Sequence, residues 1–202
     1  MKYPDFYSNI TPIKLYDPLS DFLGAFHEGK VEISYLDCVK LAGHSCPTVA
    51  GAYLMAAKGV TALYGDLLPQ RGSVKIEMRD NESAGVTGVT AHILSFILGA
   101  GGAGGFKGLQ GQFSRDNLLF YGAPIHAEVK LTRLDTMQSV NLSYDPSLIK
   151  TDEQMKVLMG KSLMELASKE EKKKFQTLWQ NRVEEILLHT DNDPKLITIT
   201  KD

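Results

Sequence analysis

Residues 49–64 form the segment that most constrains the fold of this chain. They are rich in alanine and other apolar residues along their whole length, and Gly65 follows directly. A helix that is apolar on nearly every side is stable only when other elements cover it, so the segment predicts a buried helix. Gly65 is suited to end this helix, because glycine readily adopts the backbone conformation of a helix C-terminus. The rest of the chain must therefore pack around it.

Several other segments carry the patterns of strands and of a further helix. Residues 74–79 and 125–132 alternate apolar and polar side chains, as half-exposed strands do. Residues 136–144 can return as the hairpin partner of the second strand, residues 118–121 predict another strand, and residues 87–98 predict an apolar helix. Because strands and helices are mixed without regular β-α-β alternation, we predict an α+β fold with a mixed or antiparallel sheet packed against helices.

The N-terminal part of the chain leaves one local choice open. Asp17-Pro18 is typical of a helix start, and apolar residues then recur at helical spacing up to Gly29. Residues 31–35 alternate briefly as a strand does, whereas Ser34 with Asp37 could equally cap a new helix.

Residues 149–202 differ in pattern from the preceding 148. They contain two apolar stripes at helical spacing, each preceded by a possible capping box: Thr151 with Gln154, and Ser168 with Glu171. We predict an antiparallel pair of helices, packed on the preceding domain or on a second subunit. The expected division is an α+β domain over residues 1–148 and a C-terminal helical appendage over residues 149–202.

The composition of the 202 residues excludes several classes of protein. Lysine and arginine number 22 against 24 aspartate and glutamate, so the formal net charge of −2 gives no reason to expect a nucleic-acid partner. Two cysteines are too few for a disulfide framework. The most apolar stretch, residues 86–101, falls short of the roughly 20 residues of a membrane span. With no signal peptide after Met1, we expect a cytoplasmic protein without membrane association.

The segment Gly43-His44-Ser45-Cys46-Pro47 is the motif most suggestive of chemistry. Proline fits the first turn of a helix, which places Cys46 at the N-cap. The thiol would then lie at the positive end of the helix dipole, where a thiolate is stabilised. Together with His44 it could bind a zinc ion, or His44 could act as base for a nucleophilic Cys46. The alternative without chemistry is a buried capping cysteine beside a loop histidine.

This motif resembles the Gly-His-x-Cys-Pro signature of the FmdE-like family, which is named after a component of formylmethanofuran dehydrogenase. Two further elements follow in the family's order. One is a polar-acidic turn that ends in Gly-Val, residues 80–86, and the other is a Gly-rich stretch before a short Asn-Leu strand, residues 108–121. The resemblance covers residues 17–145.

The resemblance implies an α+β protein, commonly a homodimer, with a metal-binding or thiol-containing pocket to which His44 and Cys46 belong. Some family members are encoded beside molybdenum or tungsten formylmethanofuran dehydrogenases. The chain departs from the family where a second His and a second Cys are often found, since Ala42 and Ala84 stand there. It also has no Cys after Cys46, so the C-terminal zinc ribbon of many relatives is absent.

Three hypotheses of function follow. The first is a metal-binding FmdE-like protein, which could be a metal-dependent enzyme acting on a small molecule, with zinc as the expected metal. Its ligands would be His44, Cys46, Asp80 and Glu82, with His92 and His126 as substitutes. The second is a metal-free thiol protein that uses Cys46, with His44 as partner. The third is a non-catalytic accessory module of a molybdenum or tungsten redox system, with the C-terminal helices as docking surface or dimer interface.

Other candidate residues have plainer interpretations. Asp80 and Glu82 could serve only a turn. Cys38 and His92 are expected in the core, and His126 is expected on an exposed face. The glycine-rich run from residue 99 matches G-x-G-x-x-G, but it follows a predicted helix rather than a strand, which argues against a dinucleotide site. Residues 101–111 are instead expected to form a pocket wall or a mobile lid, because glycines let backbone approach a ligand closely.

Overall fold

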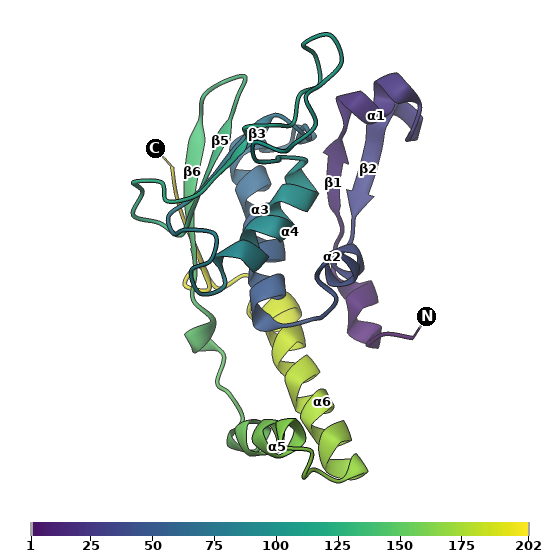
Figure 1. The fold of residues 1–202 in the computed structure, drawn as a ribbon, viewed down its shortest axis with the longest axis vertical. Helices are drawn as coiled ribbons and strands as arrows, with labels where there is room; N and C mark the ends of the chain where they lie inside the picture. Colours follow the sequence, from purple (N-terminus) through teal and green to yellow (C-terminus); the bar gives the residue numbers. More distant parts are fainter. Residues whose placement is uncertain (1, 202) are drawn as a thin grey trace.

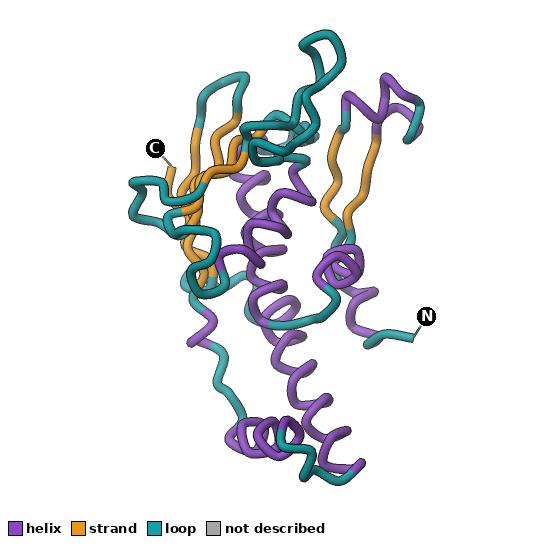
Figure 2. Tube along the Cα trace, in the orientation of Figure 1, coloured by secondary structure: helices purple, strands orange, loops and turns teal. Residues whose placement is uncertain are grey.

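The computed structural model describes residues 2–201 and confirms the α+β fold. Over these residues the α-helices are α1 (Pro18–Leu23), α2 (Tyr35–Ala42), α3 (Pro47–Tyr64), α4 (Thr87–Leu98), α5 (Glu153–Leu163) and α6 (Lys169–Glu184). The strands are β1 (Ile13–Tyr16), β2 (Lys30–Ile33), β3 (Val74–Met78), β4 (Leu119–Phe120), β5 (Val129–Arg133), β6 (Ser139–Tyr144) and β7 (Ile197–Lys201). Figure 2 shows how these helices and strands alternate along the chain.

The larger sheet is mixed, with strand order β4-β3-β5-β6-β7. Strand β4 runs parallel to β3, and every other neighbouring pair is antiparallel. Strands β5 and β6 form the predicted hairpin. The prediction of a strand from residue 125 was wrong in its start, because β5 begins only at Val129 and the preceding residues form a loop. The side chains of Val129 and Leu131 are buried, as the alternation predicts, whereas Thr132 on the predicted polar face is buried too.

Helix α3 is the centre of the structure, as its apolar composition predicts. It lies between the sheet and the small β1-β2 hairpin, and α4 runs beside it (Figure 1). Its buried residues face α4 on one side and β6 on another. The helix can approach β6 closely because Gly51 packs directly under the ring of Tyr144. Burial on several sides explains why this helix tolerates so few polar residues.

The N-terminal region contains both a strand and a helix where the sequence left the choice open. Strand β2 pairs antiparallel with β1, and α2 then begins with a complete capping box formed by Ser34 and Asp37. The helix predicted from Asp17 does form, with the Asp17 side chain accepting a hydrogen bond from the Ser20 N–H. It ends sooner than its apolar spacing suggests, because Gly24 takes a left-handed conformation and terminates α1.

The C-terminal helices α5 and α6 contact each other, as predicted. Helix α6 begins with the capping box of Ser168 and Glu171, whereas α5 is capped by Asp152 rather than by Thr151. After a π-helical turn at Glu185–His189 the chain returns to the larger sheet, where β7 pairs with β6. No strand was predicted at these residues, and the division of domains at residue 148 stays a prediction. No helix in residues 2–201 has the length and apolar character needed to cross a membrane.

Candidate functional site

The Gly43–Pro47 segment forms the turn between α2 and α3. Gly43 ends α2 with a φ of 75°, a left-handed conformation that glycine adopts without steric cost. Cys46 then caps α3, with its Sγ accepting a hydrogen bond from the Val49 N–H at 3.5 Å. The position predicted for Cys46 is therefore confirmed. The residue is 9% exposed, so its thiol lies at the edge of the core rather than in open solvent.

Ser45 is the most firmly held residue of this turn, although it was not among the predicted site residues. Its hydroxyl shares a hydrogen bond of 2.9 Å with the hydroxyl of Tyr35, and its carbonyl accepts the indole N–H of Trp179 at 2.8 Å. The Trp179 contact joins α6 to the start of α3 across 134 residues of sequence. No local pattern signals such a contact, because it depends on how the C-terminal helix returns to the domain.

A cavity of about 360 Å³ opens beside Ser45. It lies between the N-terminal segment, α2 and α6, and is lined by Pro4, Tyr7, Val39, Ser45, Phe175, Gln176, Trp179 and Gln180. None of these lining residues is charged at neutral pH, and burial raises the pKa of the Tyr7 and Tyr35 hydroxyls, which keeps them protonated. The Tyr7 hydroxyl donates to the Gln180 side-chain oxygen at 3.2 Å, which leaves the amide nitrogen of Gln180 available as a donor.

The remaining predicted site residues lie on the surface. His44 is exposed, and its Nδ1 lies 2.9 Å from the carbonyl oxygen of Ala42. Asp80 forms an ion pair with Arg79, whose hydrogen bond lowers the pKa of the Asp80 carboxyl. Glu82 accepts a long hydrogen bond of 3.4 Å from the Tyr121 hydroxyl. These contacts fit the turn role for the two acidic residues as well as a site role.

The predictions for the other thiol and histidine residues had mixed outcomes. Cys38 is fully buried, and burial raises its pKa to about 12, so the prediction of an inert core thiol is supported. His126 is exposed, as expected. The prediction that His92 lies in the core was wrong, because α4 turns this residue to solvent while Ala91 and Ile93 beside it are buried.

The side chains of one chain do not supply a complete zinc site. Within residues 2–201, no three His, Cys, Asp or Glu side chains gather closely enough to hold one metal ion. His44 and Cys46 therefore supply two ligands at most, whereas structural zinc sites use four protein ligands and catalytic sites use three. The donor set does not fit a resident zinc ion held by one chain alone.

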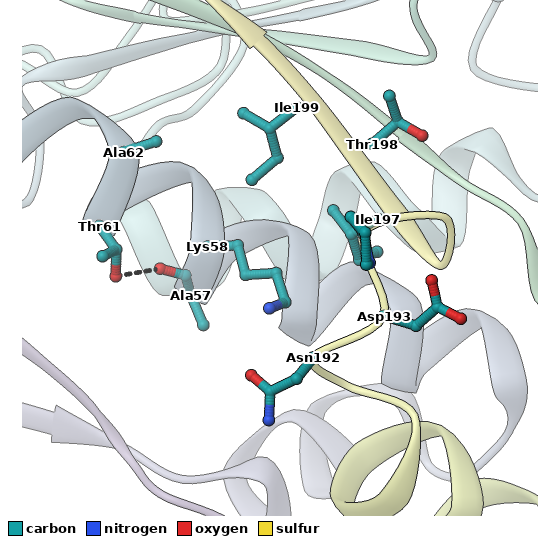
Figure 3. A pocket seen from close by; sticks show the side chains of 10 residues that line it. Ala57, Lys58, Thr61, Ala62, Asn192, Asp193, Ile197, Thr198 and Ile199 are labelled. Carbon is teal, nitrogen blue, oxygen red and sulfur yellow. Dashed lines mark hydrogen bonds between the residues drawn. The ribbon is translucent and has the colours of Figure 1, made fainter.

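A larger cavity of about 660 Å³ lies elsewhere, between α3 and β7 (Figure 3). Its walls are mainly apolar, with Ala57 and Ala62 on the helix and Ile197 and Ile199 on the strand. Lys58 projects from the helix toward the segment before β7 (Figure 3). None of the candidate residues from the sequence lies here, so its size alone does not make it the site.

No protein-family model matches this chain, and no curated protein is significantly similar to it. The resemblance to the FmdE-like family therefore stays a prediction that rests on the residues quoted for it.

Proposed function

We propose that the protein is a small-molecule-binding protein of the FmdE-like type, whose ligand occupies the cavity at Ser45. The observation that carries this proposal is the position of the cavity, which opens on the residue between His44 and Cys46. His44 and Cys46 match the family signature, and they directly precede and follow Ser45, which lines the cavity. They therefore remain the candidate catalytic residues. The hydrogen bonds of Ser45 to Tyr35 and Trp179 support the proposal, because they fix that wall before a ligand arrives.

The lining of the cavity favours an uncharged, flat ligand. A charged ligand would lose hydration without gaining a countercharge, since no lining residue carries one. The rings of Tyr7, Phe175 and Trp179 offer aromatic surface, and the amides of Gln176 and Gln180 offer donors and acceptors. We infer a nitrogen heterocycle, which combines a planar ring with a hydrogen-bonding edge.

Binding can be followed through Trp179, because it is the only tryptophan of the chain. We expect at least one of four probes, adenine, uracil, nicotinamide and pterin, to change the fluorescence of Trp179. The change should reach saturation as the probe is added, with a Kd of about 10 µM to 1 mM. Phe175→Ala should weaken that binding about tenfold, since it removes one aromatic surface. Phe120→Ala, which truncates an exposed phenylalanine on β4, serves as the matched control and should leave it unchanged. Absence of saturation with all four probes would contradict this ligand class.

Zinc binding is the second property to test, because the metal-binding hypothesis predicts it. With two ligands instead of four, we expect about half the free energy of a structural zinc site, or a Kd of about 1 to 200 µM. Competition with a chromophoric chelator measures this affinity, and His44→Ala and Cys46→Ala should each weaken it.

The same samples test the expected homodimer. Light scattering gives the mass, and two chains that share one zinc would bind one ion per dimer. One chain has a mass of 22.3 kDa. If the protein has this mass in solution and still binds zinc with nanomolar affinity, one chain supplies the full set of ligands, which would contradict our expectation.

A further inference from the structure

A cluster of charged residues lies away from the Ser45 cavity, at the other end of the β1-β2 hairpin from α2 (Figure 1). Asp17, between β1 and α1, is 1% exposed and pairs with two arginines. Arg71 Nη1 donates to Asp17 Oδ2 at 2.8 Å, and Arg115 Nη2 donates to Asp17 Oδ1. Arg71 comes from the loop before β3 and Arg115 from the loop before β4, so three separate segments meet here.

Arg71 has an evident structural role. Besides its bond to Asp17, it donates to the carbonyl oxygens of Ile97 at 2.9 Å and Phe96 at 2.6 Å. Both carbonyls belong to the last turn of α4, where helix carbonyls lack partners within the helix. A cation at this end also interacts favourably with the helix dipole. Each of its three guanidinium nitrogens is therefore engaged by the protein.

Arg115 is engaged differently. Among residues 2–201, Asp17 is the only group that accepts a hydrogen bond from its side chain, so Nε, Nη1 and the second N–H of Nη2 are donors to spare. Its backbone is held firmly, with the carbonyl accepting from the Gly101 N–H at 2.7 Å. A Cβ atom at Gly101 or Gly105 would come within 3.0 Å of the Arg115 carbonyl oxygen, so the glycine-rich loop is needed for this close approach. The glycine-rich segment 101–111 therefore holds the backbone of Arg115 in place.

Both arginines line a cavity of about 340 Å³. The other lining residues are Pro18, Leu19, Gln70, Gly72, Ser73, Gln112, Phe113 and Ser114, none of which is charged. The backbone N–H groups of Phe113 and Ser114 have no acceptor in the described part of the chain, which leaves further donors in this wall. A cavity of this size can take one small functional group together with part of a small molecule.

The charges of the cluster do not balance. Two guanidinium groups meet one carboxylate, which leaves an excess of one positive charge. Burial and the neighbouring charge of Arg115 lower the pKa of Arg71. Burial alone would raise the pKa of Asp17, but the hydrogen bond from the Ser20 N–H and the two guanidinium groups outweigh it, so the pKa of Asp17 is lowered. Of the nearby acidic residues, Asp116 is paired with Lys107. Asp21 is exposed and accepts from the Tyr16 hydroxyl, outside the lining of the cavity.

We propose that this cavity binds the anionic oxygen group of a small molecule, a phosphate or a carboxylate, through the spare donors of Arg115. A guanidinium matches either group because it presents parallel N–H donors with a full charge. Arg71 and Asp17 position Arg115: every guanidinium nitrogen of Arg71 already donates to a protein acceptor, and Asp17 is itself an anion. This site is independent of the function proposed at Ser45, and neither proposal needs the other.

The test is a titration of the whole chain with inorganic phosphate and, separately, with acetate, followed by NMR of the arginine Nε–H signals. We expect the Arg115 signal, assigned by its loss in Arg115→Lys, to shift saturably with a Kd of about 1 to 10 mM. The Arg79 signal should not shift, because that exposed arginine already pairs with Asp80. The tighter of the two anions identifies the preferred class of ligand group.

Substitutions make the assignment specific. Arg115→Gln should weaken binding of the preferred anion about tenfold or more, because it removes the charge and the paired donors. It leaves Asp17 paired with Arg71, and circular dichroism establishes that the variant is folded. Arg79→Gln removes one exposed positive charge and should leave the affinity unchanged. The proposal is overturned if neither anion shifts the Arg115 signal, or if Arg79→Gln weakens binding as much as Arg115→Gln does.

Discussion

Raising the pH from about 8 to about 11 is expected to remove roughly 7 kcal/mol from the free energy of unfolding, a large part of the roughly 5 to 15 kcal/mol that stabilises a typical domain. The cause is a set of acids that are neutral in the folded state: Cys38, Tyr35 and Tyr53, which are buried, and Tyr144, which is partly buried. Burial raises the pKa of all four, that of Cys38 to about 12. Urea unfolding at a series of pH values measures the loss.

The sign of this effect follows from which state releases protons first. The unfolded chain ionises at the ordinary pKa of each group, whereas the folded chain holds its protons to higher pH. The stability from these groups is therefore complete below the unfolded pKa values, near 9 for cysteine and 10 for tyrosine, and is lost as the pH rises toward the folded ones. At about pH 11 each tyrosine contributes a loss of between about 1 and 2 kcal/mol, and Cys38 a loss of about 3 kcal/mol.

Tyr35→Phe separates this mechanism from general charge repulsion at high pH. The variant loses the hydrogen bond to Ser45, so it should be about 1 kcal/mol less stable than wild type at neutral pH. Its stability should nevertheless fall less steeply with pH, because one ionising group is gone. Tyr3→Phe, at an exposed tyrosine, should keep the wild-type slope. Equal slopes in all three proteins would contradict the burial argument.

Gly51→Ala is expected to destabilise the fold by about 3 kcal/mol, although alanine normally favours a helix over glycine by about 1 kcal/mol. A Cβ atom at this position would lie 2.3 Å from the nearest ring carbon of Tyr144. The ring cannot move freely, because its hydroxyl donates to the Pro47 carbonyl at 3.0 Å. Displacing it would loosen both β6 and the start of α3 beside Cys46. Thermal and urea unfolding give the change in stability.

Gly160→Ala is the matched control, since this glycine also lies inside a helix but a Cβ atom there would meet no neighbouring atom within 4 Å. It should stabilise the protein by about 0.5 to 1 kcal/mol. In a Tyr144→Ala background, Gly51→Ala should become nearly neutral because the overlapping ring is absent. A loss of the same size in both backgrounds would show that the ring is not the cause.

Local patterns predicted much of the secondary structure, because they report burial and backbone preference directly. The apolar run of 49–64 gave α3, and the alternation of 74–79 gave β3. Cys46 followed by Pro47 located the helix start at the candidate site. Strand β7 was not predicted, although Ile197-Thr198-Ile199-Thr200 alternates as a half-exposed strand does; it is only five residues long, and its partner β6 lies far earlier in the chain.

The sequence alone thus determined the α+β class, the central helix and the motif at its start, since each depends on residues adjacent in the chain. Only the tertiary structure decided what surrounds that motif. The cavity at Ser45 exists because Trp179 and Tyr7 reach it from opposite ends of the chain, and Asp17 meets Arg71 and Arg115 only after three loops come together. Long-range contacts of this kind depend on how whole elements pack, and a local pattern carries no record of that packing.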